Sequence, residues 1–107
     1  MTEEELIAFR KERDALREVL HTLVKEHGGA MARDTFFGEA EKRTGAEHKA
    51  IYSALRSSQV LRFGRHGVAV ASSHKELMEK LGFKEVVDDV IEGPGMMTTL
   101  YVHYEKV

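Results

Sequence analysis

The chain of 107 residues contains no cysteine and no long apolar run. The lack of cysteine excludes disulfide bonds, thiolate zinc sites and thiol nucleophiles, and it fits a reducing compartment. No segment approaches the roughly 18 consecutive apolar residues of a membrane helix. No apolar segment follows a basic N-terminal cluster either, so we expect neither a membrane span nor a secretory signal. The expected location is intracellular, in the cytoplasm or the nucleus.

The bulk composition is that of an ordinary globular protein, with 42% apolar and 32% charged residues. The length leaves room for one domain, 1–107, with a core of modest size. A net charge of −2 excludes a protein that is basic throughout. Any binding to nucleic acid must therefore come from a local basic patch.

Capping signals and apolar spacing predict a long first helix. A capping box at Thr2 and Glu5 begins it, and His27-Gly28-Gly29 ends it. The apolar stripe is interrupted near 11–14, so the first two turns are expected to project beyond the core. This projecting start is a candidate for homodimer contact, and a solvated, frayed end is the alternative.

The rest of the chain predicts two further helices, a hairpin, a short helix and a second hairpin. The third helix, near 46–58, follows the tight turn Thr44-Gly45, where Thr44 and Glu47 are expected to form a capping box. β-Prone runs on either side of a glycine-bounded turn predict the first hairpin, Val60–Ala71. The short helix begins at a third capping box and ends at a glycine, and the last two strands flank Gly-Pro-Gly. Those signals are Ser73 with Glu76, Gly82, and the runs 84–92 and 97–104. The expected fold class is α+β.

Positive charge is concentrated in residues 42–66. This window carries +5 in a chain of −2, so the other 82 residues carry −7. Its only acid is Glu47, and it covers the third helix and the first hairpin. Basic charge on one helix and one hairpin is typical of a nucleic-acid-binding surface, although ordinary solvated charge is the alternative for each residue taken alone.

Residues 11–71 resemble a winged-helix domain. Three helices precede a two-stranded wing, and the stretch TGAEHKAIYSALRSSQVLRFGRHGVAVAS, Thr44 to Ser72, carries the resemblance. Residues 72–107 would extend this core with a helix and a hairpin. The resemblance implies a third helix in the major groove and a wing on the backbone or minor groove, with duplex DNA as the favoured partner. The implied nucleic-acid-binding residues are His48, Lys49, Tyr52, Ser53, Arg56, Arg62, Arg65 and His66.

The C-terminal part is also similar to the end of PUB (PUG) domains, through HKELMEKLGFKEV (His74 to Val86) and LYVHYE. That resemblance implies an adaptor that binds the C-terminal tail of a AAA ATPase in the ubiquitin pathway. Its peptide-binding residues would be Tyr52, Arg56, Gly82 and Phe83. Two features depart from the PUB pattern. The chain has no asparagine where one is expected after Arg56, and 28–44 is an extra segment.

The sequence contains no recognised catalytic or metal motif. The six histidines form no His-Glu-x-x-His pair. Adjacent residues of a strand point to opposite faces, so Asp88 and Asp89 are not expected to share a substrate. The turn 64–67 lacks the lysine and hydroxyl of a P-loop, and the turn 93–95 is expected within a hairpin rather than before a helix. No serine lies in a nucleophile elbow. We therefore expect a protein that is not an enzyme and that uses no cofactor or metal.

Overall fold

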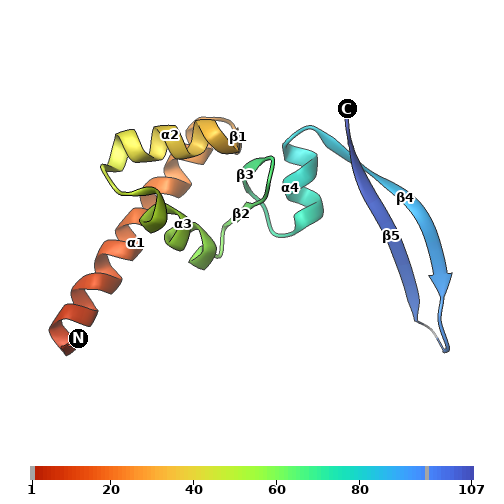
Figure 1. Ribbon diagram of the computed structural model, residues 1–107, viewed down its shortest axis with the longest axis horizontal. Coiled ribbons are helices and arrows are strands. Elements are labelled where there is room, and N and C mark those ends of the chain that lie inside the picture. The colour runs from red at the N-terminus through yellow and green to blue at the C-terminus, as the bar shows by residue number, and fades with distance from the viewer. Residues whose placement is uncertain (1, 96) are drawn as a thin grey trace.

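The computed structural model describes residues 2–95 and 97–107, which form a mixed α+β structure with four helices and two small antiparallel sheets (Figure 1). The molecule is elongated, about 53 × 32 × 18 Å. None of the helices in the described residues is both long and apolar enough to cross a membrane. In chain order the elements are α1 (Glu3–Glu26), β1 (Ala30–Ala32), α2 (Arg33–Thr44), α3 (His48–Ser57), β2 (Leu61–Phe63), β3 (Gly67–Val70), α4 (His74–Lys80), β4 (Phe83–Glu92) and β5 (Thr98–Lys106).

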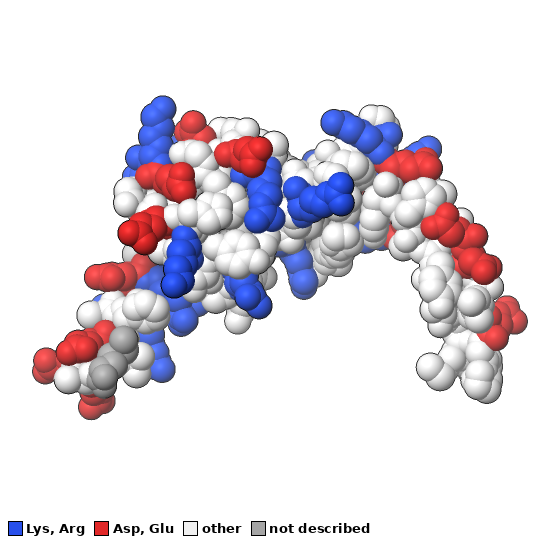
Figure 2. Space-filling view, in the orientation of Figure 1, with Lys and Arg blue, Asp and Glu red and all other residues white. Residues whose placement is uncertain are grey.

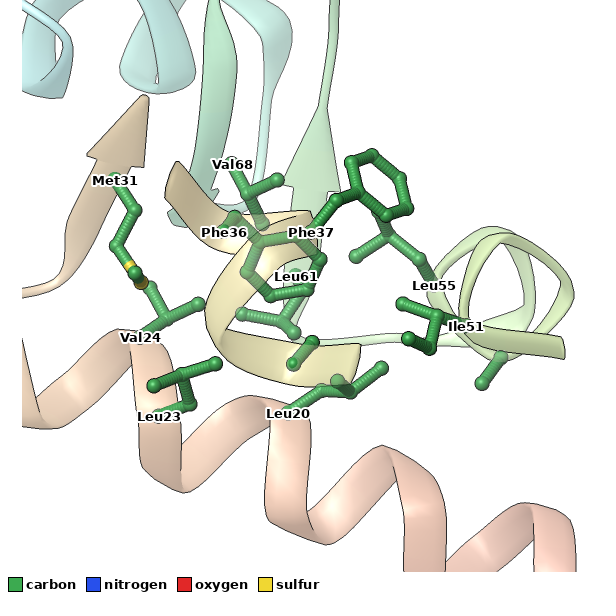
Figure 3. Close-up of a cluster of buried hydrophobic side chains, with 12 residues drawn as sticks. Leu20, Leu23, Val24, Met31, Phe36, Phe37, Ile51, Leu55, Leu61 and Val68 are labelled. Atoms are coloured by element: carbon green, nitrogen blue, oxygen red, sulfur yellow. The ribbon is translucent and has the colours of Figure 1, made fainter. Parts of the chain in front are cut away.

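The main core lies where the C-terminal half of α1 meets α2, α3 and the first sheet (Figure 3). Its members are apolar and almost fully buried, and they recur at helical spacing within each helix. Burial of each large apolar side chain contributes roughly 1.5–3 kcal/mol. The largest are Leu20, Leu23, Val24, Phe36, Ile51, Leu55 and Val68.

The first sheet has three antiparallel strands in the order β1-β3-β2, so β3 is central. The predicted hairpin is confirmed as β2 and β3, with Leu61 opposite Val70 and Phe63 opposite Val68. The strand β1, which pairs Met31 with Val68, was not predicted from the sequence. Three residues, Ala-Met-Ala, are too few to show a strand pattern, and the strand depends on β3 for its hydrogen bonds.

The start of α3 differs from the prediction. The helix begins at His48 rather than at 46, and the side chain of Glu47 makes no capping hydrogen bond. The Thr44 hydroxyl instead accepts a hydrogen bond from the Ala46 N–H (3.1 Å) and donates one to the Ala40 carbonyl (2.7 Å). Gly45 has a φ of +67°, the left-handed conformation that favours glycine after a helix. Thr44 therefore secures the end of α2 and the turn, and it does not cap α3.

The two other capping predictions are confirmed at their hydroxyl groups. Thr2 Oγ1 accepts a hydrogen bond from the Glu5 N–H, and Ser73 Oγ accepts one from the Glu76 N–H, each at 3.2 Å. The Glu76 carboxylate does not return to the Ser73 backbone. It accepts hydrogen bonds from the N–H and hydroxyl of Ser72, which lower the pKa of Glu76 below its usual range. This contact ties the start of α4 to the end of β3.

The strands β4 and β5 form a second, separate sheet, which we call the distal hairpin (Phe83–Lys106). The pairing skips Asp88, which forms a bulge between Val87 and Asp89. At the base of the hairpin, the Tyr104 ring meets the His74 ring of α4, with centroids 5.4 Å apart. Beyond this base the hairpin leaves the rest of the molecule (Figure 1).

The N-terminal half of α1 projects at the opposite end of the molecule (Figure 1). Leu6, Ile7 and Phe9 are 38%, 47% and 49% exposed, whereas Leu20 and Leu23 on the same helix are fully buried. The expectation that the first turns extend beyond the core is confirmed. This half of α1 is therefore free to contact another molecule.

Candidate nucleic-acid interface

The helix α3 buries one face and exposes the other, because its apolar residues repeat at helical spacing. Ile51, Ala54 and Leu55 enter the core, so Lys49, Ser53 and Arg56 are left exposed. Lys49 and Arg56 are seven residues apart, which is close to two helical turns, and they share an outer edge of the helix. Two cations therefore follow one line along α3.

The first hairpin supplies two more exposed cations. Arg62 lies in the middle of β2, and Arg65 lies in the turn between β2 and β3. One guanidinium nitrogen of Arg62 donates a hydrogen bond to the Ser72 carbonyl at 3.0 Å. This bond orients the side chain of Arg62, and an arginine with five donors keeps others for a ligand.

The acids of the described residues form no close pair with these cations. Among residues 2–95 and 97–107, Lys49, Arg56, Arg62 and Arg65 form no ion pair. In Figure 2, basic side chains gather over the middle of the molecule, and acidic ones line the outer edge of the distal hairpin. The electrostatic field of the four cations therefore points into solvent.

Three other predicted site residues, His48, Tyr52 and His66, pack against aromatic rings. The first two belong to α3. His48 stacks on Phe37 (centroids 4.2 Å apart), and its Nδ1 lies 3.7 Å from a carboxylate oxygen of Glu41. Tyr52 is half-buried edge-on against Phe63 of β2, with centroids 5.3 Å apart. Both residues thus help to fix α3 against its neighbours.

His66, in the turn of the first hairpin, packs at a tilt against Phe83 at the base of the distal hairpin, with ring centroids 4.6 Å apart. This contact links the two hairpins. Phe83 and the adjacent Gly82 belong to the predicted peptide site with Tyr52 and Arg56. Tyr52 packs on Phe63 instead, so the rings of that predicted site lie in two different aromatic contacts.

Arg33 was not predicted as a site residue, yet it joins α2 to the first hairpin. Its guanidinium lies 5.5 Å from the Phe37 ring, and it donates a hydrogen bond to the Gly64 carbonyl at 3.4 Å. Because Arg33 follows β1, its position depends on a strand with no sequence signal of its own. It holds the turn that carries Arg65 near the start of α2.

Within the described ranges, no group of three His, Asp or Glu side chains is arranged to hold a metal ion. Comparison of the chain with known protein families, characterised proteins and solved structures finds no match. The functional argument therefore comes from the geometry and charge of the surface itself.

Proposed function

We propose that this protein is a non-enzymatic winged-helix protein that binds nucleic acid, with duplex DNA as the preferred form. The observation that carries the proposal is the set of exposed cations on α3 and the first hairpin. Lys49, Arg56, Arg62 and Arg65 come from two adjacent elements and have no carboxylate partner in the described part of the chain. A surface of this kind attracts phosphates and releases their counterions.

The order of the elements supports the proposal. Helix, strand, helix, helix, strand and strand follow one another, and β1 joins the β2–β3 hairpin through β3. In a winged helix the third helix enters the major groove, and the hairpin is the wing. In this proposal α3 is the recognition helix, and the turn that carries Arg65 is the tip of the wing.

The residues divide into two roles. Lys49, Arg56, Arg62 and Arg65 contact phosphates, and Ser53, exposed on α3, approaches base edges. His48, Tyr52 and His66 sit at the border of the surface, where their ring contacts fix its shape. Substitution of the first group removes contacts with DNA. Substitution of the second group changes DNA affinity indirectly, because it alters the position of α3 and the first hairpin.

The expected affinity is modest. Four phosphate contacts give a slope of about −3.6 for log K against log [salt], at about −0.9 per phosphate. A single module of this size binds DNA non-specifically with a Kd of roughly 10⁻⁴ to 10⁻⁶ M at physiological salt. Sequence specificity would need a second copy or a larger assembly.

Fluorescence anisotropy with a labelled duplex tests the proposal. We expect binding at about 50 mM salt that weakens steeply towards about 200 mM. The double variant Arg56→Glu, Arg65→Glu should lose it, because both side chains are exposed and make no ion pair with the residues that the structure describes. The double variant Lys11→Glu, Lys84→Glu is the matched control. It changes the net charge by the same amount, but its two substitutions lie on α1 and the distal hairpin, away from α3 and the first hairpin.

Two results would overturn the proposal. One is no anisotropy change at about 50 mM salt with tens of micromolar protein, where even non-specific binding should appear. The other is equal loss of binding in both double variants, which would mean that net charge alone matters. A response to an acidic-aromatic peptide at Tyr52 and Phe83, without one to DNA, would favour the PUB-like adaptor instead.

A further inference from the structure

A groove of about 1220 Å³ lies between α1 and α3 on the side where the N-terminal half of α1 projects. Its lining includes the basic residues Arg13, Arg43 and Lys49 and three glutamates. The apolar part of the lining consists of small or aliphatic side chains and one aromatic ring. These are Phe9, Ala15, Leu16, Val19, Ala46 and Ala50.

One side of the groove belongs to a stripe that runs the length of α1. Residues 6, 9, 13, 16, 20 and 23 alternate in steps of three and four, which is the spacing of a seam between two packed helices. The C-terminal part of this stripe is covered by the chain's own core. The N-terminal part, with Leu6 and Phe9 38% and 49% exposed, is not covered.

Arg13 interrupts the stripe and is left incompletely satisfied. Its Nε has no access to solvent and no hydrogen-bond partner in the described part of the chain. The guanidinium lies 6.0 Å from the centroid of the Phe9 ring. The residue as a whole is half-buried, and a guanidinium carries five N–H donors, so a carboxylate from another molecule would be favourable beside it.

The distribution of charge along α1 indicates which molecule could bind in the groove. The first turn holds Glu3, Glu4 and Glu5, whereas residues 10–17 hold four cations and two acids. We propose that α1 of a second copy of this chain lies antiparallel in the groove. This orientation places the acidic first turn of each α1 against the basic middle of the other and close to Arg13.

The arrangement is closed by a two-fold axis. Each copy contributes its projecting α1 and receives the α1 of its partner between its own α1 and α3, so both exposed stripes are covered at once. A parallel pair would instead bring six glutamates together at one end, which is unfavourable. The groove shares Lys49 and Ser53 with the proposed nucleic-acid surface, whereas Arg56 and Arg65 do not line it, so the variants Arg56→Glu and Phe9→Glu test the two proposals separately.

Sedimentation velocity and light scattering test the proposal on the full chain. We expect the wild type to be a dimer at about 100 μM, a concentration that reveals even micromolar association. Phe9→Glu should be a monomer. Ile7→Glu is the matched control, because it is equally exposed (47%) on the same helix but does not line the groove. Circular dichroism confirms that both variants are folded.

A wild-type chain that stays monomeric at that concentration overturns the proposal, and so does a Phe9→Glu variant that remains a dimer. Leu100→Glu examines the competing surface, the exposed apolar face of the distal hairpin. A dimer that dissociates with Leu100→Glu and persists with Phe9→Glu would place the interface on the hairpin, which contradicts the proposal.

The orientation has its own test, because a chain without cysteine accepts a single introduced label site. A spin label at Glu4→Cys reports the distance between the two helix starts. An antiparallel pair with residue 4 beside the partner's Arg13 separates them by roughly 17 Å, from nine residues at about 1.5 Å each and a lateral spacing of about 10 Å. A parallel pair would hold them about 10 Å apart, the usual distance between packed helices, and this result would refute the antiparallel arrangement.

Discussion

Gly67 of β3 passes so close to β1 that a Cβ at this position would lie 2.3 Å from the carbonyl oxygen of Met31. The same Cβ would lie 2.6 Å from a methyl carbon of Leu81. The close approach lets the central strand pair with β1 and lets the end of α4 cover it. The glycine is required here for space, since its φ is not positive.

Gly67→Ala should therefore destabilise the protein by about 1–3 kcal/mol, because either β1 or Leu81 must move. Urea unfolding followed by circular dichroism measures the change. Gly64→Ala is the matched control in the same hairpin, since its Cβ would lie 3.7 Å from Leu77, an ordinary contact. Equal stability of the two variants would show that the strands have room to separate.

Replacing Leu20 by alanine should lower the free energy of unfolding by about 2–5 kcal/mol, because it removes a fully buried side chain from the core. Ile7→Ala on the projecting half of the same helix should change it by less than about 0.5 kcal/mol. Chemical denaturation of both variants checks the contrast. Similar losses would mean that the two halves of α1 are equally packed.

Lys49→Gln should weaken duplex binding by a similar factor for all DNA sequences, because phosphate contacts carry no sequence information. The slope of log K against log [salt] should become shallower by about 0.9, the value for one phosphate. A salt titration by fluorescence anisotropy measures it, with Lys11→Gln as the control. An unchanged slope would remove Lys49 from the interface.

His103 of the distal hairpin lies between two carboxylates, with its Nε2 2.9 Å from Glu105 and its Nδ1 2.7 Å from Asp88. The hydrogen bonds to Glu105 and then Asp88 raise the pKa of His103 above its ordinary 6.5. The stabilisation of the hairpin by protonated His103 is complete below pH 6.5 and is lost as the pH rises through the raised folded-state value.

An NMR pH titration of the His103 ring protons checks this prediction. Glu105→Gln should move the pKa back towards 6.5, because Glu105 is the largest cause of the increase. A wild-type His103 that titrates at or below its ordinary value would contradict the contacts described here. The effect on stability should be small, since all three side chains are exposed.

The elements with local signals could be predicted from the sequence. Residues close together in the chain indicate the capping hydroxyls of Thr2 and Ser73 and the glycine-bounded hairpins. The strand β1 has no such signal, because it forms only against β3, more than thirty residues away. The start of α3 was misplaced for a related reason, since the Thr44 hydroxyl bonds backwards to Ala40 and leaves Glu47 unused.

For the candidate site, the sequence predicts which charges are present but not which rings lie beside them. The exposure of Lys49 and Arg56 follows from the burial of Ile51 and Leu55 at helical spacing. The contacts of His48 and Tyr52 depend on Phe37 and Phe63, which other elements bring to α3. No spacing within one helix encodes such pairings.

The bulge at Asp88 bears on how the distal hairpin can pair with strands of other molecules. The strands β4 and β5 carry several exposed Val, Ile, Leu and Tyr side chains, a composition that favours stacking of strands into fibrils. An extra residue interrupts the regular ladder of β4 and increases its local twist, so a flat foreign strand cannot align along the whole of it. The bulge at one aspartate thus limits how a strand from another molecule can extend this long, partly apolar ribbon.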